Sequence, residues 1–256
     1  MIKGESLIPG TISKISGESI TTAAWNPDEP FGAVLPFNRI RNLTEYDYYF
    51  IYDERYAKQL KEINPNSYYL PFGPDVDVHR EQIPLWMRSY KYDISFVGTA
   101  YSNRQYLLEQ ISKKHSSLAI YGHGWSQASK QLKKFVNKKV PMGPALAYVF
   151  NESKINLNIY GPSQKFVVPN PRTFEIPASR NFQLATYHKS ITRHFKPGKE
   201  IVLYRNEDEL FELIDWYLDN DEEREKVAQA GYDRVLKEHT MRHRLQRMFK
   251  IMNMKL

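Results

Sequence analysis

Arg172 and Glu175 are the residues of this sequence best suited to binding chemistry. They lie within residues 170–186, whose pattern predicts a short helix that runs directly into an apolar strand. In an open α/β sheet, ligands bind at such junctions. A guanidinium donates forked hydrogen bonds to a phosphate, and a carboxylate accepts hydrogen bonds from two neighbouring sugar hydroxyls. The pair therefore suggests a nucleotide-sugar site, and the alternative is a surface helix with a weak exposed ion pair.

A second candidate site follows the apolar run at residues 93–97. Gly98 and Thr99 end the expected strand, and Arg104 stands near the start of an expected helix. A glycine between a strand and a helix N-terminus offers backbone N–H groups to an anion, and Arg104 would add a positive charge. The alternative is an ordinary tight turn with an exposed arginine.

Gly122 and Gly124 end the apolar run at residues 118–121 in the same way. This segment is not the dinucleotide-binding fingerprint, because Gln127 takes the position of the third glycine and no acidic residue follows at the usual distance. The sequence also contains no Gly-Lys-Ser/Thr phosphate loop. The segment predicts at most the same kind of backbone anion site.

Metal-binding patterns in the sequence are weak. Asp75 and Asp77 form an Asp-x-Asp pair of the kind that holds a divalent cation in some sugar-transferring enzymes, but their position in an expected linker favours a solvated turn. His239 and His243 have helical ligand spacing, yet Thr240 as a helix cap would leave His239 outside the helix. The chain has no cysteine, which excludes thiol catalysis and thiolate metal sites. We therefore expect no metal site.

The elements that must position these residues alternate from about residue 90 onward. Strands are expected at residues 93–97, 118–121, 154–159, 182–185 and 201–204, and helices at residues 103–114, 144–151, 172–178 and 207–218. Alternation of this kind predicts a parallel sheet with helices on its faces, as in a Rossmann-like domain.

Capping residues mark the starts of the last three helices. Asn206 and Glu209 form a capping pair for the helix at residues 207–218. Asp221 is expected to cap the next helix, which runs to about Lys237, and Thr240 to cap a final helix that reaches the C-terminus.

The first part of the chain shows a weaker but similar pattern. Strands are expected at residues 20–25, 46–51 and 67–70, and a helix at residues 54–63. The Pro- and Gly-rich residues 70–74 and the stretch to Trp86 read as a connection between domains. We expect an α/β fold of two Rossmann-like lobes: an incomplete N-terminal lobe with its linker at residues 1–88, a C-terminal lobe at residues 89–240, and a last helix at residues 241–256.

Composition favours a globular protein with anionic partners. The 256 residues are 41% hydrophobic and 25% charged, and the net charge is +7 with a pI near 9.3. The excess lies mainly in residues 130–139 and 242–255, for which a solvated helix face is the alternative. No apolar run resembles a signal peptide or approaches the roughly 20 residues of a membrane span, so a cytoplasmic protein is expected.

Nine short segments, taken in order, resemble one family. They are residues 3–5, 25–31, 70–73, 93–99 with Arg104, 121–125, 154–158, 172–178, 195–200 and 238–240. Together they resemble the CgeB-like spore maturation family of group 1 glycosyltransferases, whose B-type fold has two Rossmann-like lobes. The resemblance covers nearly the whole chain.

The resemblance implies a nucleoside-diphosphate-sugar donor held mainly by the C-terminal lobe and an acceptor that approaches from the N-terminal lobe. Helix N-termini and basic side chains would stabilise the leaving diphosphate, so no obligatory metal and no cofactor are expected. The last helix would cross back to the N-terminal lobe. Peripheral association with an acidic membrane surface is compatible with the positive charge, nucleic-acid binding is not expected, and the sequence does not predict the oligomeric state.

Site residues carried over from the family fall in the C-terminal lobe. Glu175 matches the second glutamate of the family's paired-glutamate motif and would bind the donor ribose, whereas Val167 stands where the first glutamate would be. The diphosphate would face Arg104 and Arg172, and Thr173 belongs to the same donor-binding segment. The residues expected to allow a close approach of the donor are Gly98, Thr99, Gly122 and Gly124.

Two departures from the family pattern affect this interpretation. Arg180 stands where relatives usually carry a glycine, and its bulk would either close the approach to the ligand or supply another phosphate contact. The chain also begins near what resembles the fourth strand of the usual N-terminal lobe. Both departures keep a second hypothesis open, namely an inactive binding or assembly module or a truncated fragment.

The leading hypothesis is a metal-independent glycosyltransferase that moves a sugar to a surface glycan or a glycosylated protein. Asp28 is the one candidate for a catalytic base, and the leaving phosphate itself can serve in retaining members of the class. A nucleic-acid-binding protein would explain the pI but neither the strand-end glycines nor Glu175.

Overall fold

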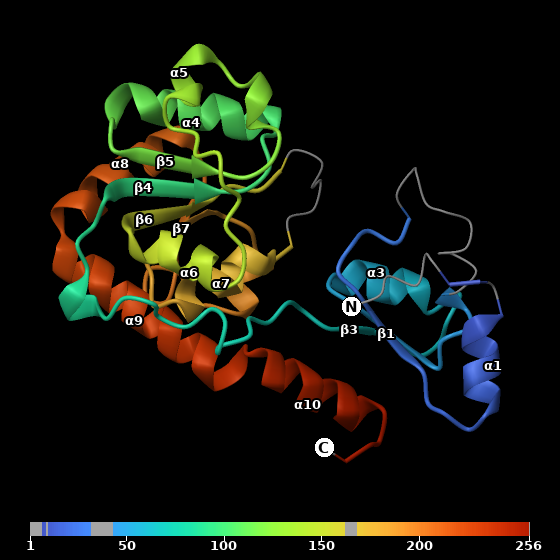
Figure 1. Cartoon of the computed structure of the whole chain (residues 1–256). Helices are drawn as coiled ribbons and strands as arrows, with labels where there is room; N and C mark the ends of the chain where they lie inside the picture. Colours follow the sequence, from blue (N-terminus) through green and yellow to red (C-terminus); the bar gives the residue numbers. More distant parts are fainter. Residues whose placement is uncertain (1–6, 9, 32–42, 162–167, 256) are drawn as a thin grey trace. The chain divides into compact units, whose positions relative to one another are not determined.

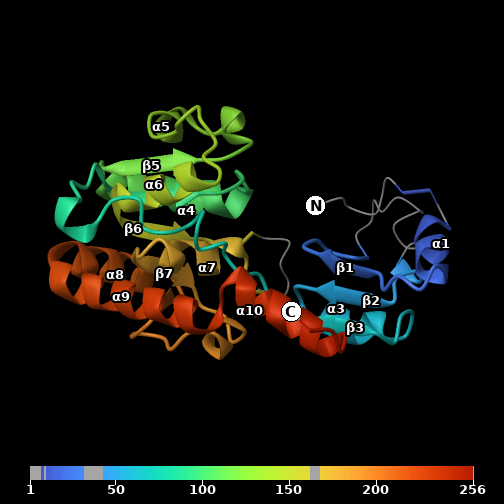
Figure 2. The same cartoon turned by 60° about the horizontal axis from the view of Figure 1, so that its bottom comes forward.

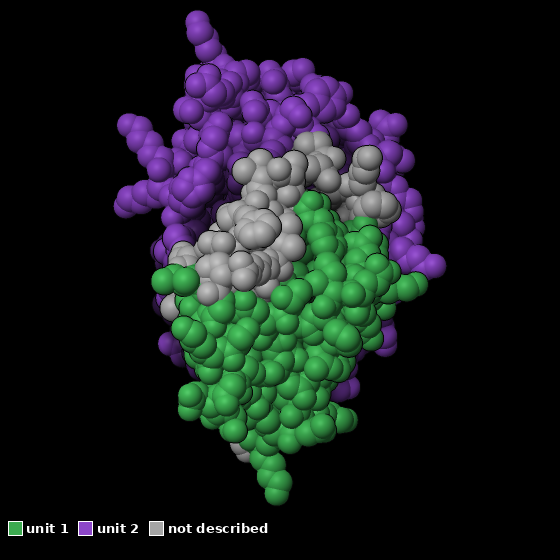
Figure 3. Space-filling view, turned by 90° about the vertical axis from the view of Figure 1, so that its right-hand side faces the viewer, with its two compact units in different colours: residues 1–72, 244–256 green, residues 73–243 purple. Residues whose placement is uncertain are grey.

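A computed structural model describes residues 7–8, 10–31, 43–161 and 168–255. The chain forms two compact units, one of residues 1–72 with 244–256 and one of residues 73–243, which Figure 3 shows in different colours. Residues 73–88, which the sequence analysis assigned to the first lobe as a linker, are grouped with the second unit. No helix in the described part of the chain is long and apolar enough to cross a lipid bilayer.

The second unit is built on a five-stranded parallel sheet with strand order β5-β4-β6-β7-β8 (Figure 1). The strands are β4 (Tyr92–Val97), β5 (Leu118–Tyr121), β6 (Ser153–Asn158), β7 (Gln183–Thr186) and β8 (Val202–Tyr204). Most residues of these strands are buried, because helices cover both faces of the sheet. The predicted α/β fold with a parallel sheet is therefore confirmed in this unit.

Helices of the second unit divide between the two faces of the sheet. They are α4 (Ser102–Lys114), α5 (Lys130–Lys133), α6 (Pro144–Asn151), α7 (Pro171–Ala178), α8 (Glu207–Asp219) and α9 (Asp221–Glu238), with short 3-10 turns η2 (Leu85–Met87), η3 (Trp125–Gln127) and η4 (Ile191–Arg193). Apolar residues of α4, α5, α8 and α9 pack with Ile94 and Phe96 of β4, whereas those of α6 and α7 pack with Val97. Neighbouring side chains of β4 thus pack against helices on opposite faces of the sheet, because successive side chains of a strand point in opposite directions.

Two capping predictions for these helices had different outcomes. The Asn206 side chain accepts a hydrogen bond from the Glu209 backbone N–H at 2.9 Å, and Glu209 accepts one from the Arg205 N–H at 2.6 Å, which confirms the capping pair of α8. Asp221 is not the cap of α9, because Asn220 occupies the cap position. Asp221 is the first helical residue instead, and its carboxylate pairs with Arg224 at 2.6 Å.

The first unit contains a smaller parallel sheet with strand order β1-β2-β3. Its elements are α1 (Thr11–Gly17), β1 (Ala23–Asn26), β2 (Tyr48–Ile51), α3 (Glu54–Leu60) and β3 (Ser67–Tyr69). β1 begins three residues later than the expected strand at 20–25, and α3 ends three residues before the expected helix end at 63. The type and order of the three strands and α3 agree with the sequence pattern, whereas their ends depend on local turns and α1 was not predicted.

Helix α10 (Met241–Ile251) completes the first unit with its residues from 244 onward. The Thr240 hydroxyl accepts the His243 N–H at 3.4 Å, which confirms the predicted cap. Arg244 is 7% exposed and donates to the Phe72 carbonyl at 2.9 Å. Burial lowers the pKa of Arg244 to about 10, so the side chain is still charged at neutral pH and needs this acceptor.

Helix α9 packs against α7 at a glycine, and the two helices lie side by side in Figures 1 and 2. A Cβ atom added to Gly231 would lie 2.5 Å from the backbone oxygen of Glu200 and 3.3 Å from Pro177. Arg234, one turn later, donates to both oxygens of the Glu200 carboxylate at 3.0 and 2.9 Å. The close contact at Gly231 allows that ion pair to form.

The Gly231→Ala substitution should therefore destabilise the protein although alanine favours helices. We expect a loss of about 2 kcal/mol or more in the free energy of unfolding, since backbone atoms at Glu200 must move. The measurement is urea-induced unfolding followed by circular dichroism. Gly17→Ala in α1 is the matched control, because no atom lies within 4 Å of the added Cβ. Equal stability of the two variants would contradict the argument.

Candidate functional site

The carboxyl ends of β4 and β5 meet through two glycines. These strands are parallel neighbours, so their ends lie at the same edge of the sheet. Gly122 has φ +133°, and a Cβ atom there would collide with the backbone oxygen of Gly98. The Gly98 N–H donates to the Tyr121 carbonyl at 2.9 Å, and the Trp125 indole N–H donates to the Gly98 carbonyl at 2.9 Å. Only glycine at position 122 permits this contact.

Thr99 and Gly124 continue the same two loops. The Ala100 N–H donates to the His123 carbonyl at 2.9 Å, which joins the loops a second time. Gly124 has φ +82°, and an added Cβ atom would make only ordinary contacts, the nearest with Ala100 at 3.5 Å, so glycine is favoured there by its backbone conformation. The four residues predicted to allow close approach of a ligand, Gly98, Thr99, Gly122 and Gly124, therefore lie together at this edge.

Arg104 is fixed at the start of α4 by backbone carbonyls. Its Nε donates to the Ile159 carbonyl at 2.8 Å and its Nη1 to the Thr99 carbonyl at 3.0 Å. The guanidinium also lies over the ring of Tyr101, 4.9 Å from its centroid. Burial lowers the pKa of Arg104, and the positive charge of Arg172 lowers it further. The two arginines predicted to face a diphosphate are thus close enough to repel each other.

Arg172 and Glu175 form an ion pair on one face of α7, as their spacing predicts. Arg172 also donates to the Val97 carbonyl at 3.4 Å, which places it at the end of β4. The second carboxylate oxygen of Glu175 lies 3.6 Å from Nε2 of His79. The Glu175 side chain is only 15% exposed, so this is a partly buried arrangement and not the exposed surface pair of the alternative interpretation.

His79 was not identified from the sequence, because it lies in the segment read as a linker. Its Nδ1 faces the Asp75 carbonyl at 3.0 Å, and its backbone N–H donates to the same oxygen at 2.8 Å. Asp75 also accepts the Asp77 N–H through its side chain at 3.0 Å, so this pair forms the turn that positions His79. In the described residues, no three acidic or histidine side chains cluster as a metal site.

Thr173 lies inside the fold and not at the surface of the site. It is fully buried, and its hydroxyl contacts Asn170, Tyr160 and Asn158 at 3.1, 2.7 and 3.3 Å. Burial raises the pKa of Tyr160, which therefore stays protonated at neutral pH. The Thr173 hydroxyl is thus fully engaged inside the fold, where its bonds fix the first turn of α7.

Asn158 and Asn170 complete this buried polar network. Their side-chain amides pair reciprocally at 3.1 and 2.9 Å. Asn170 also caps α7 by accepting the Thr173 N–H at 3.0 Å. The network therefore fixes the first turn of α7 to the end of β6. The only sign of this network in the sequence was the asparagine immediately before Pro171, a position typical of a helix cap.

Arg180 lies at the other edge of the same sheet. It directly precedes β7, so it stands near the amino ends of the strands, opposite Gly98 and Arg104. Its φ is +55°, a left-handed conformation that explains why relatives would carry glycine there. Its side chain pairs with Glu81 at 3.3 Å. Arg180 therefore lies away from the carboxyl edge, where a donor is expected.

The remaining predicted residues lie elsewhere. Asp28 belongs to the first unit, where its backbone N–H donates to the Asn26 side chain at 2.9 Å. Val167 lies outside the described residues. The second unit alone therefore contains the cluster of Arg104, Arg172 and Glu175 with the glycine loops.

Comparison with known proteins points to one family. Residues 104–250, more than half of the chain, match the model of the family described as glycosyl transferase-like. The chain is also 23% identical to spore protein CgeB of Bacillus subtilis over 249 residues, which cover 91% of this chain and 75% of that protein. The resemblance stated from the nine segments is thus confirmed.

Solved structures agree with this assignment at the level of the fold. TarM from S. aureus, in complex with fondaparinux, α-GlcNAc-glycerol and UDP, has a TM-score of 0.65 and 11% identity, with 91% of this chain and 51% of TarM covered. HepE from Anabaena, in complex with UDP-glucose, has a TM-score of 0.65 and 7% identity, with 94% and 74% covered. The chain thus spans about half the length of TarM. These likenesses confirm the predicted B-type fold.

Replacement of Thr173 by valine should reveal the role of the buried network. Valine has nearly the same shape but removes one hydrogen-bond partner from each of Tyr160, Asn170 and Asn158, so we expect a loss of about 2 kcal/mol in the free energy of unfolding. Guanidinium-induced unfolding measures this loss, with Thr173→Ser as the control that keeps the hydroxyl. A valine variant as stable as the serine variant would argue against the network.

Proposed function

The chain belongs to the glycosyl transferase-like family, and on that premise we propose that it transfers a sugar from a nucleoside-diphosphate donor to an acceptor. Family membership agrees with the predicted enzyme class, a glycosyltransferase. The observation that carries the proposal is the cluster of Arg104, Arg172 and Glu175 beside the glycine contact at the carboxyl edge of the sheet.

The two arginines are the proposed site of the diphosphate. Arg104 has two of its donors fixed on backbone carbonyls, so its remaining nitrogen is held in place before any ligand arrives. Arg172 lies close enough for its charge to disfavour the charged form of Arg104. A bound diphosphate relieves that repulsion and accepts hydrogen bonds from both guanidinium groups.

Glu175 is the proposed acceptor for the donor ribose. Arg172 and His79 each approach one of its two oxygens. A carboxylate has about four acceptor positions, so two remain for neighbouring hydroxyls. Because the side chain is partly buried and held from both sides, it is oriented in advance and loses little entropy on binding.

The arginine pair also supports the chemistry of transfer. Negative charge develops on the leaving diphosphate as the bond to the sugar breaks, and fixed positive charges at that point stabilise the transition state. We propose that these side chains replace a metal ion in this role. Asp28 of the first unit stays a candidate for the base that activates the acceptor hydroxyl.

TarM and HepE, which share the fold, were crystallised with UDP or UDP-glucose, so a uridine donor is the first to test. The proposed acceptor is a surface glycan or a glycosylated protein. Nucleotide binding without sugar transfer would favour the alternative, a non-catalytic binding module.

Calorimetric titration of the full chain with UDP and GDP tests the donor site. The Glu175→Ala variant should bind the preferred nucleotide at least about tenfold more weakly, the loss expected for hydrogen bonds to a charged group. Glu212→Ala is the matched control, since Glu212 is an exposed carboxylate on α8. Unchanged nucleotide affinity in the Glu175→Ala variant would contradict the assignment of Glu175 to the donor ribose.

Removal of divalent metals tests the role of the arginine pair. In EDTA, the rate of donor hydrolysis or sugar transfer should stay within about twofold of the rate without chelator. Arg172→Gln should lower kcat by about a hundredfold, because a charge that stabilises the transition state is lost. The rates are measured by release of nucleoside diphosphate. A requirement for added Mn²⁺ or Mg²⁺ would overturn the proposal of metal independence.

A further inference from the structure

The segment of residues 74–88, which carries His79, is hydrogen-bonded to the rest of the second unit on both sides of that residue. Before it, the Pro74 carbonyl accepts the Met241 N–H at 2.8 Å. After it, the Asn151 side chain at the end of α6 accepts the Gln82 N–H at 2.8 Å. The backbone that carries His79 is therefore fixed to α6 and to the start of α10.

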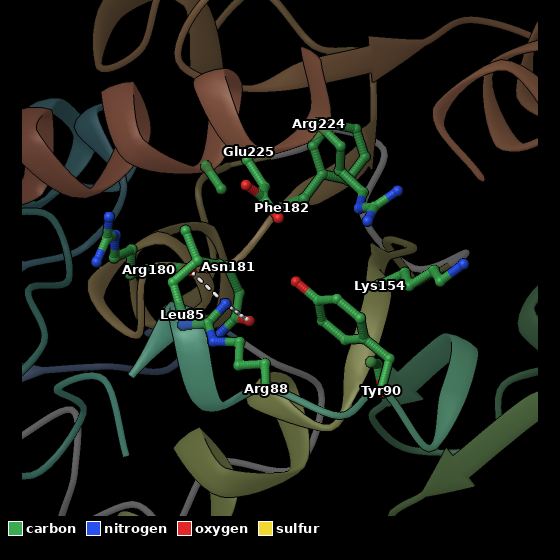
Figure 4. A pocket seen from close by; sticks show the side chains of 11 residues that line it. Leu85, Arg88, Tyr90, Lys154, Arg180, Asn181, Phe182, Arg224 and Glu225 are labelled. Atoms are coloured by element: carbon green, nitrogen blue, oxygen red, sulfur yellow. Dashed lines mark hydrogen bonds between the residues drawn. The ribbon is translucent and has the colours of Figure 1, made fainter. Parts of the chain in front are cut away.

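The end of the same segment is fixed by Arg88, which lines the small cavity shown in Figure 4. Its guanidinium donates to the Arg180 carbonyl at 3.0 Å and to the Asn181 side chain at 3.2 Å. Glu81 accepts another of its hydrogen bonds at 3.0 Å. The segment thus has a defined place in the second unit, and so does the ring of His79.

The two ring nitrogens of His79 face different groups. Nδ1 lies 3.0 Å from the Asp75 carbonyl oxygen, and a carbonyl oxygen only accepts hydrogen bonds. The proton of the neutral ring is therefore on Nδ1, and Nε2 is left with a lone pair. Nε2 lies 3.6 Å from Oε1 of Glu175, an ion-pair distance, and each side chain is only 15% exposed. A lone pair repels a carboxylate oxygen, so the contact becomes attractive only when Nε2 also carries a proton.

Glu175 is the carboxylate that the ring faces. The other charged residue of α7 is Arg172, which pairs with the second oxygen of Glu175. Helix α6, next to the segment, contains no charged residue. The charged side chains near His79 on its own segment are exposed or paired with arginine: Asp75, Asp77, Arg80 and Glu81. Solvent screens the exposed charges, so the ring and Glu175 act mainly on each other.

We propose that His79 is a positioning residue of the donor site and that it acts in its doubly protonated form. The imidazolium holds Oε1 of Glu175 while Arg172 holds Oε2, which sets the direction of the carboxylate toward the ribose hydroxyls. This inference rests on the proposed function, because the ligand is the same nucleotide sugar.

Binding of the donor is coupled to this proton. The negatively charged diphosphate engages Arg172, the same arginine that neutralises Glu175. A positive ring at position 79 offsets the repulsion between the diphosphate and the Glu175 carboxylate. The complex therefore takes up a proton as it forms. Donor affinity is highest below the pH range in which imidazole loses its second proton, and it falls as the pH rises through that range.

Calorimetric titration of the full chain with UDP-glucose and with GDP-mannose tests this coupling. The phosphates of these diesters do not titrate near neutral pH, whereas the terminal phosphates of UDP and GDP do. For the sugar nucleotide that binds, affinity should be about fivefold higher at pH 6 than at pH 8, the size of one partly exposed ion pair. Titrations in HEPES and in Tris, which differ in their heats of ionisation, should show net proton uptake on binding.

Three variants assign the proton to His79. His79→Gln keeps a neutral N–H near the position of Nε2, so affinity at neutral pH should be retained while the pH dependence and the proton uptake disappear. His79→Ala removes the contact and should bind about fivefold more weakly at pH 6. His115→Gln, beside Asp215 at the end of α4, is the matched control and should keep the original pH profile.

The outcomes separate this inference from the proposed function. A pH dependence or proton uptake that persists in His79→Gln overturns the role of His79, as does full affinity of His79→Ala at pH 6. If Glu175→Ala weakens donor binding and His79→Ala does not, the donor site stands and this inference alone fails. If the unchanged chain binds neither sugar nucleotide, both fail.

Discussion

The contact between the backbones of Gly98 and Gly122 is the constraint on which the candidate site depends. The loops that follow β4 and β5 must lie against each other before side chains from both can face one ligand. The indole of Trp125 then closes the arrangement by donating to the Gly98 carbonyl. Because backbone atoms fill the junction, the donors of Arg104 are held on fixed carbonyls and not on mobile side chains. Such rigidity is what electrostatic stabilisation of a leaving group requires.

Helix α7 connects the two edges of the sheet. Its first turn carries Arg172 and Glu175, fixed from below by the amide pair of Asn158 and Asn170. Its last residue is followed, two positions later, by the strained Arg180 at the opposite edge. The polar groups of the first edge are thus ordered by buried hydrogen bonds, whereas those of the second are ordered by the many bonds of Arg88.

Much of this arrangement could be predicted from the sequence where a local pattern decides it. The spacing of Arg172 and Glu175 placed both on one helix face, and the apolar run at residues 118–121 marked β5 with its observed ends. Thr173 is buried beside the partly exposed Arg172 because adjacent helical residues point about 100° apart, so neighbours in sequence need not share a surface. Arg180 lies at the amino edge, as does any loop that leads from a helix to the next parallel strand, so the expected order of elements already separated it from the carboxyl edge. His79 reaches Glu175 from 96 positions away, a contact that no local pattern contains.

Helix α10 gives the chain an order of assembly during synthesis. The unit that begins the chain is completed by residues 244–256, and the bond from Arg244 to Phe72 joins residues 172 positions apart. A ribosome that has made residues 1–72 has therefore not yet made the helix that covers them. The second unit, continuous at residues 73–243, has all its parts first and can fold while translation continues. The strands β1 to β3 are therefore made well before residues 244–256 of the same unit, an interval in which unpaired sheet edges are exposed to pairing with other chains.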